Sequence, residues 1–245
     1  KDIPDYAQAL MSKFWPGPMT LILPRTQNSK DFVTGGQSSV GLRMPNHPVA
    51  LGLIRAFSFL GGHGLAAPSA NRYGAVSPTT ALSVKEELEA YLNEGDLILD
   101  GGSSEVGVES TIIDCTGPNP AILRPGAITA EDIELCTGIV VAEPAQATIR
   151  VSGSHKQHYS PQAKVVVGGL ALAGEGLVAN SEFGTPAGVI RLAAPTSVEE
   201  YARMLYAALR AADAQGLKTV RVIAPEGAGL AIAIRDRIQR SASEG

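Results

Sequence analysis

Hydrophobic residues in the first half of the chain occur in two patterns. Some recur at helical spacing among polar residues, and others form short continuous runs. Residues 5–14 have apolar positions at helical spacing, and the prolines and glycine of residues 16–18 end that segment because they do not continue a helix. Short apolar runs between glycine, proline or polar residues predict strands. We expect helices over 5–14, 48–60, 80–95 and 129–137, and strands over 20–23, 38–44, 64–67, 97–99, 110–114 and 121–124. The last two strands should pair across the turn at 117–120. Thr79 or Thr80 should cap the third helix, and Thr129 with Asp132 should begin the fourth.

The periodicity disappears between residues 142 and 162, where proline, alanine, serine, glycine and histidine dominate. Beyond this stretch, strand patterns alternate with helical patterns, and Ser197 with Glu200 forms a capping-box sequence before a long helix. The alternation predicts a small, largely parallel α/β domain. We expect a first domain over 1–141, a linker over 142–162 and a second domain over 163–245, with strands at 164–167, 188–192 and 219–223 and helices at 197–212 and 231–240.

Composition narrows the class of protein. The chain has 245 residues, a formal net charge of −4 and a pI of about 5.6, which argues against a broad basic surface for nucleic acid. No apolar run reaches the roughly 20 residues that a membrane-spanning helix needs, so we expect no contact with a membrane. Cys115 and Cys136 are too few for a disulfide framework, and they indicate buried free thiols in a reducing compartment, which favours the cytoplasm.

The sequence lacks the motifs of metal and nucleophile chemistry. Its histidines have no cysteine or glutamate partners at ligand spacing, and no nucleophile elbow, complete P-loop or dinucleotide fingerprint occurs. What remains is a group of polar residues at predicted strand ends and in the polar loop 67–80. They are Ser39, Arg43, Ser69, Asn71, Ser77, Thr79, Ser110, Thr111 and Arg124.

This polar group favours an anionic ligand. Guanidinium groups such as those of Arg43 and Arg124 pair bidentately with carboxylates and phosphates, and open α/β sheets bind ligands beyond their strand ends. Each residue also has a structural alternative, since an arginine at a strand end is commonly part of a surface ion pair and a serine or threonine there is commonly a cap or turn residue. The residues alone lead no further than an anion-binding pocket.

Several short motifs follow one another in a fixed order along nearly the whole chain. They are FWPGPMT at 14–20, VGLRMP at 40–45, APSAN at 67–71, SPT at 77–79, GVESTI at 107–112, LRPG at 123–126, HYSP at 158–161, LYAALR at 205–210 and RDR at 235–237. Together they resemble the threonylcarbamoyl-AMP synthases in their two-domain form. The resemblance implies a YrdC-like twisted mixed sheet with flanking helices, joined by a linker to a smaller Rossmann-like parallel α/β domain. Family members carry first strands and a Lys-x-Arg phosphate-binding motif that this sequence does not show, so we expect the N-terminal part of the YrdC-like domain to be absent from residues 1–141.

The resemblance also implies an activity. The family condenses L-threonine, bicarbonate and ATP into threonylcarbamoyl-AMP with release of pyrophosphate, for the threonylcarbamoyladenosine modification at position 37 of tRNA. ATP is then a substrate, Mg²⁺ is expected on its phosphates, and no side chain is expected to be a catalytic nucleophile or a metal ligand. By motif match, L-threonine contacts Arg43, Ser69 and Ser110, and ATP contacts Ser39, Asn71, Thr79, Arg124 and Tyr159, with Ser77 as the alternative to Thr79.

Further expectations concern partners. The linker would close over the nucleotide through Tyr159, and the product would bring transient contact with the tRNA threonylcarbamoyl-transferase machinery. Two alternatives stay open. One is an RNA-binding YrdC-like module, which the acidic net charge disfavours. The other is a carbamoyl-transferring maturation factor, which needs zinc-finger cysteine pairs that this sequence lacks.

Overall fold

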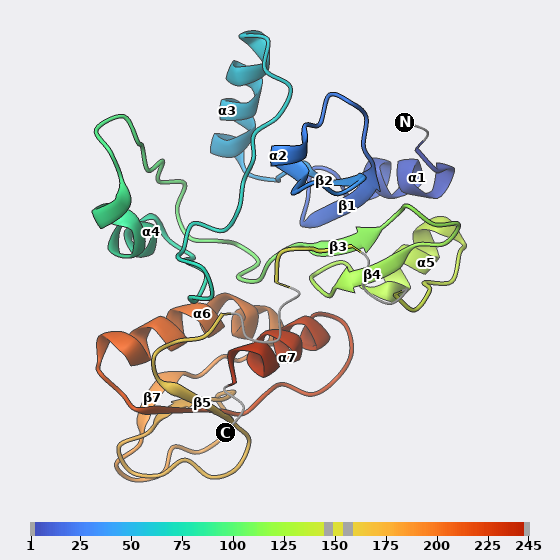
Figure 1. Cartoon of the computed structure of the whole chain (residues 1–245). Coiled ribbons are helices and arrows are strands. Elements are labelled where there is room, and N and C mark those ends of the chain that lie inside the picture. The colour runs from blue at the N-terminus through green and yellow to red at the C-terminus, as the bar shows by residue number, and fades with distance from the viewer. Residues whose placement is uncertain (1–2, 145–148, 154–158, 243–245) are drawn as a thin grey trace. The chain divides into compact units, whose positions relative to one another are not determined.

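The computed structural model describes residues 3–144, 149–153 and 159–242 (Figure 1). The chain forms two compact units, each built from two separate stretches: Lys1–Pro68 with Glu109–Ser154, and Ser69–Val108 with His155–Gly245. The domain boundaries expected from the sequence stay a prediction. His158, the first residue of the linker motif, lies outside the described residues.

The first unit contains a mixed sheet, as predicted, and its four strands follow the order β2-β1-β3-β4. Strand β1 runs antiparallel to β2 and parallel to β3, and β3 forms the predicted antiparallel pair with β4 across the turn at residues 117–120. The strands are β1 Met19–Pro24, β2 Ser39–Arg43, β3 Thr111–Asp114 and β4 Ala121–Arg124.

Two helices cover one face of this sheet. They are α1 (Asp5–Phe14) and α5 (Ala130–Thr137), and α5 begins with the capping box of Thr129 and Asp132. Alternate residues of β1 enter the shared core, because side chains along a strand point to opposite faces. The buried residues of this core are Tyr6, Ala7, Leu10, Met19, Leu21, Leu23, Ile113, Cys115 and Ile133.

The stretch between β2 and β3 departs from the prediction. Residues 64–67 and 97–99 form no strand, and Leu97 is 83% exposed. An apolar run forms a strand only beside a ladder partner, and the described residues offer these two runs none. The helices of this stretch and of the preceding loop are α2 (Asp31–Thr34), α3 (Pro48–Phe59), α4 (Ala81–Leu88) and the short 3₁₀ turn η1 (Glu89–Tyr91), so the helix expected to reach residue 95 ends early.

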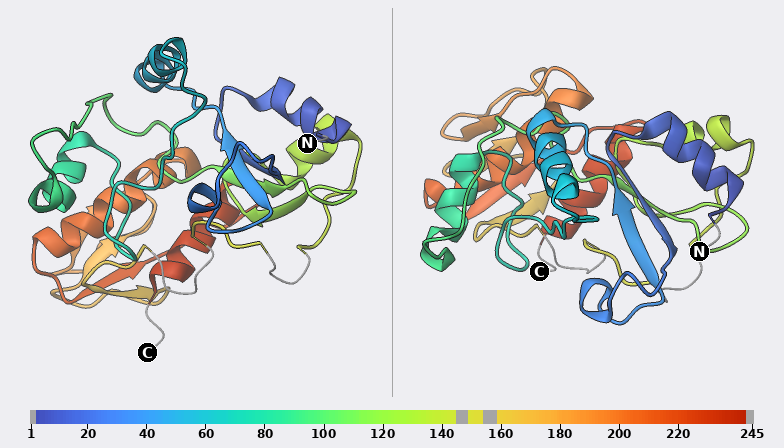
Figure 2. Two further views of the ribbon diagram at one scale, coloured as in Figure 1. Left: turned by 45° about the horizontal axis from the view of Figure 1, so that its top comes forward. Right: turned by 90° about the horizontal axis from the view of Figure 1, so that it is seen from above.

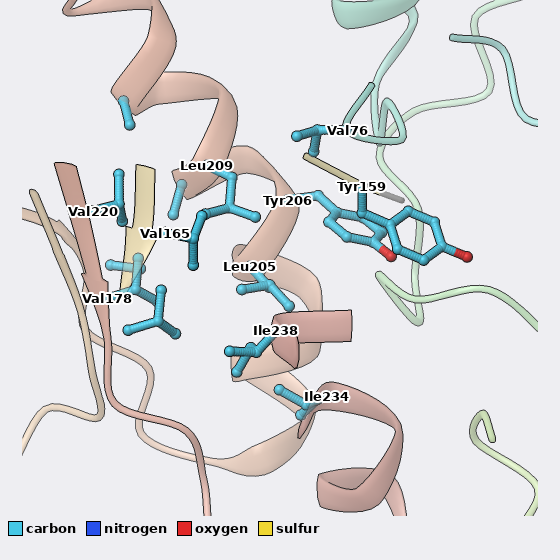
Figure 3. Close-up of a cluster of buried hydrophobic side chains, with 14 of the residues drawn as sticks. Val76, Tyr159, Val165, Val178, Leu205, Tyr206, Leu209, Val220, Ile234 and Ile238 are labelled. Atoms are coloured by element: carbon cyan, nitrogen blue, oxygen red, sulfur yellow. The ribbon is translucent and has the colours of Figure 1, made fainter. Parts of the chain in front are cut away.

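The C-terminal part of the second unit contains a parallel sheet in the order β5-β8-β6-β7, which confirms the predicted parallel α/β architecture. Helices α6 (Val198–Ala214) and α7 (Leu230–Ser241) pack on it through one aliphatic cluster (Figures 1, 2 and 3). The strands are β5 Lys164–Val167, β6 Gly176–Val178, β7 Ile190–Ala193 and β8 Thr219–Val222.

Two local details differ from expectation. Strand β6 was not predicted, because three residues behind a glycine give no alternating pattern to detect. The capping box at α6 is half formed. The Ser197 hydroxyl accepts the Glu200 N–H at 3.1 Å, but the Glu200 carboxylate accepts from Thr196 instead of from Ser197.

Both cysteines are free, and Cys115 is buried whereas Cys136 is half-buried. Burial raises the pKa of the Cys115 thiol to about 12, with the nearby Asp114 charge adding to the shift. This thiol is therefore protonated and unreactive at neutral pH. Within the described ranges, no helix is both long and apolar enough to cross a bilayer.

Candidate functional site

The candidate residues of the first unit share one face of its sheet. Thr20 lies opposite Arg43 in the β1–β2 ladder and opposite Ile112 in the β1–β3 ladder, and Ile112 lies opposite Arg124. Directly opposed residues of neighbouring strands point to the same face. Since Met19 and Leu21 of β1 belong to the core with α1 and α5, this row points away from the helices.

Ser110 belongs to the same face, two residues before Ile112. Its hydroxyl lies 2.8 Å from the Thr20 hydroxyl, and the Arg124 guanidinium donates to its carbonyl at 2.9 and 3.1 Å and to its Oγ at 3.2 Å. Arg124 also donates to the Ser152 carbonyl at 3.1 Å. The structure thus brings Ser110 and Arg124 together, both of them buried, in a network that fixes the Ser110 hydroxyl.

Arg43 occupies the end of β2 and is exposed. Its guanidinium donates one hydrogen bond to the Ala67 carbonyl at 2.7 Å, and no carboxylate pairs with it among the described residues. A guanidinium has several N–H donors in a planar fork, so Arg43 keeps its charge and most of its donors for another partner.

Ser39 begins β2 on the same face, four residues before Arg43, and is buried. Gly41 lies between them, and a Cβ there would come within 3.2 Å of the Ile22 side chain and 3.5 Å of the Thr20 side chain. The glycine therefore keeps the middle of the row clear. We call these residues the polar face of the first sheet, which consists of Thr20, Ser39, Arg43, Ser110 and Arg124.

Sequence reasoning missed one member of this face, Thr20. The available signal was the alternation of β1, since Thr20 lies between the core residues Met19 and Leu21. The preceding turn holds it in place, because Trp15 Nε1 donates to the Met19 carbonyl at 2.8 Å and Gly17 N donates to the Met44 carbonyl at 2.9 Å. A polar residue between apolar ones is also typical of a strand with one solvent-exposed face, so the pattern alone does not indicate a site.

Asn71 lies in the polar loop of the second unit. Its Nδ2 donates to the carbonyls of Arg72 at 2.7 Å and Ala75 at 3.1 Å, and these two acceptors fix the orientation of the amide. Its Oδ1 is buried and has no hydrogen-bond partner among the described residues. A buried unpaired acceptor is costly, so this oxygen is suited to an N–H donor supplied from outside the chain.

The other loop candidates have different roles in the second unit. Thr80, not Thr79, caps α4, because its side chain accepts the Ser83 N–H at 3.2 Å. The Thr79 hydroxyl is thus spared from the capping role, and the Thr79 carbonyl accepts from Ser104 N at 2.9 Å. Ser77 is buried and Ser69 is exposed.

Tyr159 lies in the core of the second unit. It is 1% exposed, and its ring stacks on Tyr206 with centroids 5.5 Å apart, while the Arg237 guanidinium carbon lies 5.6 Å from the ring centroid. The hydroxyl end points away from the aliphatic cluster (Figure 3). The backbone has a φ of 63°, a left-handed conformation that persists in a non-glycine residue only where its surroundings hold it.

The described residues contain no cluster of metal-binding side chains. Across residues 3–144, 149–153 and 159–242, no set of three histidine, cysteine, aspartate or glutamate side chains could hold an ion. The side chains of the polar face offer hydrogen-bond donors and acceptors and positive charge.

Comparisons with known proteins agree with this picture. The Sua5/YciO/YrdC family model, described as telomere recombination, matches residues 1–126, and the model of the threonylcarbamoyl-AMP synthase C-terminal domain matches residues 128–243. The chain is 36% identical to the threonylcarbamoyl-AMP synthase of Pyrococcus abyssi over 98% of its own length and 75% of that protein. Over 67% of its length it is 41% identical to the synthase of Bacillus subtilis, and this match covers 47% of that protein.

Solved structures give the same result. The crystal structure of P. abyssi Sua5 complexed with L-threonine matches 99% of this chain with a TM-score of 0.84 at 34% identity, and the chain covers 75% of it. A second P. abyssi Sua5 structure, in which a neighbouring histidine and tyrosine are both changed to alanine, matches with a TM-score of 0.82 at 33% identity. The chain therefore belongs to the two-domain Sua5 family of threonylcarbamoyl-AMP synthases.

Proposed function

We propose that this protein is an L-threonylcarbamoyladenylate synthase, which forms threonylcarbamoyl-AMP and pyrophosphate from L-threonine, bicarbonate and ATP. The observation that carries the proposal is the polar face of the first sheet. There an arginine that no carboxylate of the described residues pairs with lies across β1 from a fixed serine hydroxyl. This arrangement suits an amino acid, because the guanidinium pairs with a carboxylate and the hydroxyl bonds a polar side chain or amine.

L-Threonine would contact Arg43, Ser69 and Ser110. Arg43 binds the carboxylate, and the Ser110 hydroxyl is held ready by Thr20 and Arg124. A hydroxyl with fixed partners loses little freedom when a ligand binds. The P. abyssi relative has been solved in complex with L-threonine, which supports this substrate.

ATP would contact Ser39, Asn71, Thr79, Arg124 and Tyr159, with Ser77 as the alternative to Thr79. The unpaired Oδ1 of Asn71 is an acceptor, and the exocyclic amine of adenine is a donor that would satisfy it. Tyr159 presents its hydroxyl away from the aliphatic core (Figure 3). The histidine–tyrosine pair changed in the P. abyssi variant corresponds in residue type to His158 and Tyr159.

The reaction would proceed by assembly. The threonine amine attacks bicarbonate or the carbon dioxide derived from it, and water or a proton leaves as the carbamate forms. A carbamate oxygen then attacks the α-phosphorus of ATP, and pyrophosphate leaves. The residues position the substrates and neutralise negative charge. Mg²⁺ would be held mainly by the ATP phosphates, as is usual for this ion.

The product would serve the modification of tRNA, through transient contact with the tRNA threonylcarbamoyl-transferase machinery. We place the protein in the cytoplasm because Cys115 and Cys136 are free thiols.

A doubly labelled assay tests the proposed function. The full-length protein is incubated with L-threonine, ¹⁴C-bicarbonate and α-³²P-ATP, and one product should contain both labels while pyrophosphate accumulates in proportion. Omission of threonine should abolish both signals. Pyrophosphate release that continues without threonine, or ³²P-AMP without ¹⁴C, would refute the proposed reaction.

A further inference from the structure

Helix α6 presents two separate faces to the rest of the second unit. Leu205, Leu209 and Ala212 pack toward the parallel sheet as part of its aliphatic cluster. Ala202, Tyr206 and Arg210 follow one another at intervals of four and therefore form a second stripe along the helix. This second stripe, which we call the loop face of α6, contacts residues of the stretch 69–108.

The first contact is between backbones. Gly107 has a φ of 82°, and a Cβ at this residue would clash with the Ala202 carbonyl of α6. Only glycine allows this approach. In the middle of the stripe, Tyr206 belongs to the same buried cluster as Val76, a residue of the polar loop (Figure 3).

The last contact is polar. Arg210 donates from both terminal nitrogens to Oε2 of Glu87 at 3.0 and 3.1 Å, and also to the Ser83 carbonyl at 3.3 Å. The other carboxylate oxygen of Glu87 accepts from Arg72 Nε at 2.8 Å and from Arg72 N at 3.3 Å. Glu87 thus joins α6 to the polar loop through α4.

Glu87 is ionised in this position. Its side chain is 7% exposed, and burial by itself raises the pKa of the carboxyl group, but the hydrogen bonds from Arg72 and the charge of Arg210 outweigh burial and bring the pKa below its ordinary value. Apolar packing does not replace this bridge, because α4 contains no buried residue and Leu82 is 65% exposed.

The bridge that Glu87 forms between Arg210 and Arg72 ends next to Asn71, a residue of the proposed ATP site. Arg72 follows Asn71 directly, and its carbonyl accepts from Asn71 Nδ2. The backbone N–H of Arg72 is bound by Glu87, so displacement of Glu87 would release the peptide that orients the Asn71 amide. The feature that depends on this peptide is the orientation of one buried acceptor, Asn71 Oδ1.

We propose that Arg210 and Glu87 are positioning residues that hold the Asn71 loop on α6, so that α6 forms part of the framework of the ATP site. The proposal rests on the proposed function only in its assignment of Asn71 to ATP. The physical link between α6 and the loop is independent of what the loop binds.

The test uses the full-length protein and a matched ion pair as control. Arg210→Gln and Glu87→Gln remove the bridge. Glu175→Gln removes an equivalent pair, Glu175 with Arg221, in which both side chains are 15% exposed and which does not contact the polar loop. Hydrogen exchange of peptides covering residues 69–76 is measured without ligand, and the KM for ATP is measured with threonine and bicarbonate saturating.

We expect Arg210→Gln and Glu87→Gln to speed exchange in the loop severalfold and to raise the KM for ATP about tenfold, with a smaller change in kcat. The double variant should be no worse than Glu87→Gln alone, because Glu87→Gln already weakens the contacts with both Arg210 and Arg72. Arg210→Lys should restore part of the effect, since it keeps the charge but not the planar fork, and it decides the test if the glutamine variants unfold. Glu175→Gln should leave loop exchange and KM unchanged.

Equal loop exchange in Arg210→Gln and Glu175→Gln, or unchanged exchange in both Arg210→Gln and Arg210→Lys, would overturn the proposal. Failure of the proposed function gives a different result. The wild-type protein would then show no threonine-dependent pyrophosphate release, while the exchange measurement would still report whether α6 holds the loop.

Discussion

Two arginines on the two sheets of the molecule illustrate how a structural guanidinium differs from one available to a ligand. Arg43 in β2 and Arg221 in β8 both point away from the helices that cover their sheets. Arg221 binds the Glu175 carboxylate at 3.1 and 3.4 Å and the Gly168 carbonyl at 2.9 Å. Arg43 has a single hydrogen bond among the described residues, to a neutral carbonyl.

Arg191 extends the comparison within the second unit. Its guanidinium donates to the carbonyls of residues 179, 180, 183 and 193 and to the Thr185 hydroxyl. Its donors are used inside the fold, as those of Arg221 are. What distinguishes Arg43 is therefore neither its residue type nor its place at a strand end, but the donors and the charge that its own fold leaves unused.

The largest expected effect is that of Arg43→Gln. Loss of a charge-assisted contact to the threonine carboxylate should lower kcat/KM for threonine by about a hundredfold or more. Because Arg43 makes a single hydrogen bond to the described residues, the free energy of unfolding should change by less than about 0.5 kcal/mol. Steady-state pyrophosphate release and urea unfolding measure the two quantities.

Arg221→Gln is the matched control for that experiment and should behave in the opposite way. It leaves the Glu175 carboxylate without its partner, so the free energy of unfolding should fall by about 1–3 kcal/mol. The kcat/KM of the folded fraction should stay at the wild-type value. The comparison fails if both variants lose activity in proportion to stability.

A smaller effect is expected from Thr20→Val, which removes the hydroxyl that holds Ser110 while keeping the shape of the side chain. Loss of one neutral hydrogen bond corresponds to about 0.5–1.5 kcal/mol, so kcat/KM for threonine should fall about two- to tenfold. Thr137→Val is the control, because the Thr137 hydroxyl bonds the Ile133 carbonyl within α5, on the covered side of the sheet. If both variants give the same loss of activity, Thr20 does not position Ser110.

The sequence predicted those elements whose signals are local. The helix over residues 5–14, the capping box at Thr129 and the antiparallel β3–β4 pair all follow from spacing, caps and turns, and all are confirmed. The runs at 64–67 and 97–99 have the composition of strands but form none, because pairing requires a partner that composition does not reveal.

The candidate site divides in the same way. Residue type and strand ends led to Arg43, Ser110 and Arg124, and the structure places all three on one face. Thr20 was missed because its role depends on the ladder register between β1 and β3, which brings it to Ser110, a residue 90 positions away in the sequence. The bridge from Arg210 to Glu87 could not be predicted from the sequence either, because it joins side chains 123 positions apart.

The smallest expected effect is a change of stability at acidic pH. It distinguishes Arg221, which pairs with a carboxylate, from Arg43, which bonds a neutral carbonyl. Hydrogen bonds from Arg221, and next the Leu172 N–H, hold the pKa of Glu175 below its ordinary value. A carboxyl group with a lowered pKa in the folded state stabilises the protein fully above its unfolded-state pKa of about 4.3, and this contribution is lost as the pH falls through the lower, folded-state value.

The unfolding free energies of wild type and Glu175→Gln should therefore differ most at pH 6–7, and the gap should narrow below about pH 4. The same pair of urea titrations on Arg43→Gln should show a difference from wild type that does not change with pH, because no carboxylate among the described residues pairs with Arg43. A pH-dependent difference for Arg43→Gln would reveal an acidic partner. The charge of Arg43 would then already be balanced inside the protein, and its assignment to the threonine carboxylate would lose its physical basis.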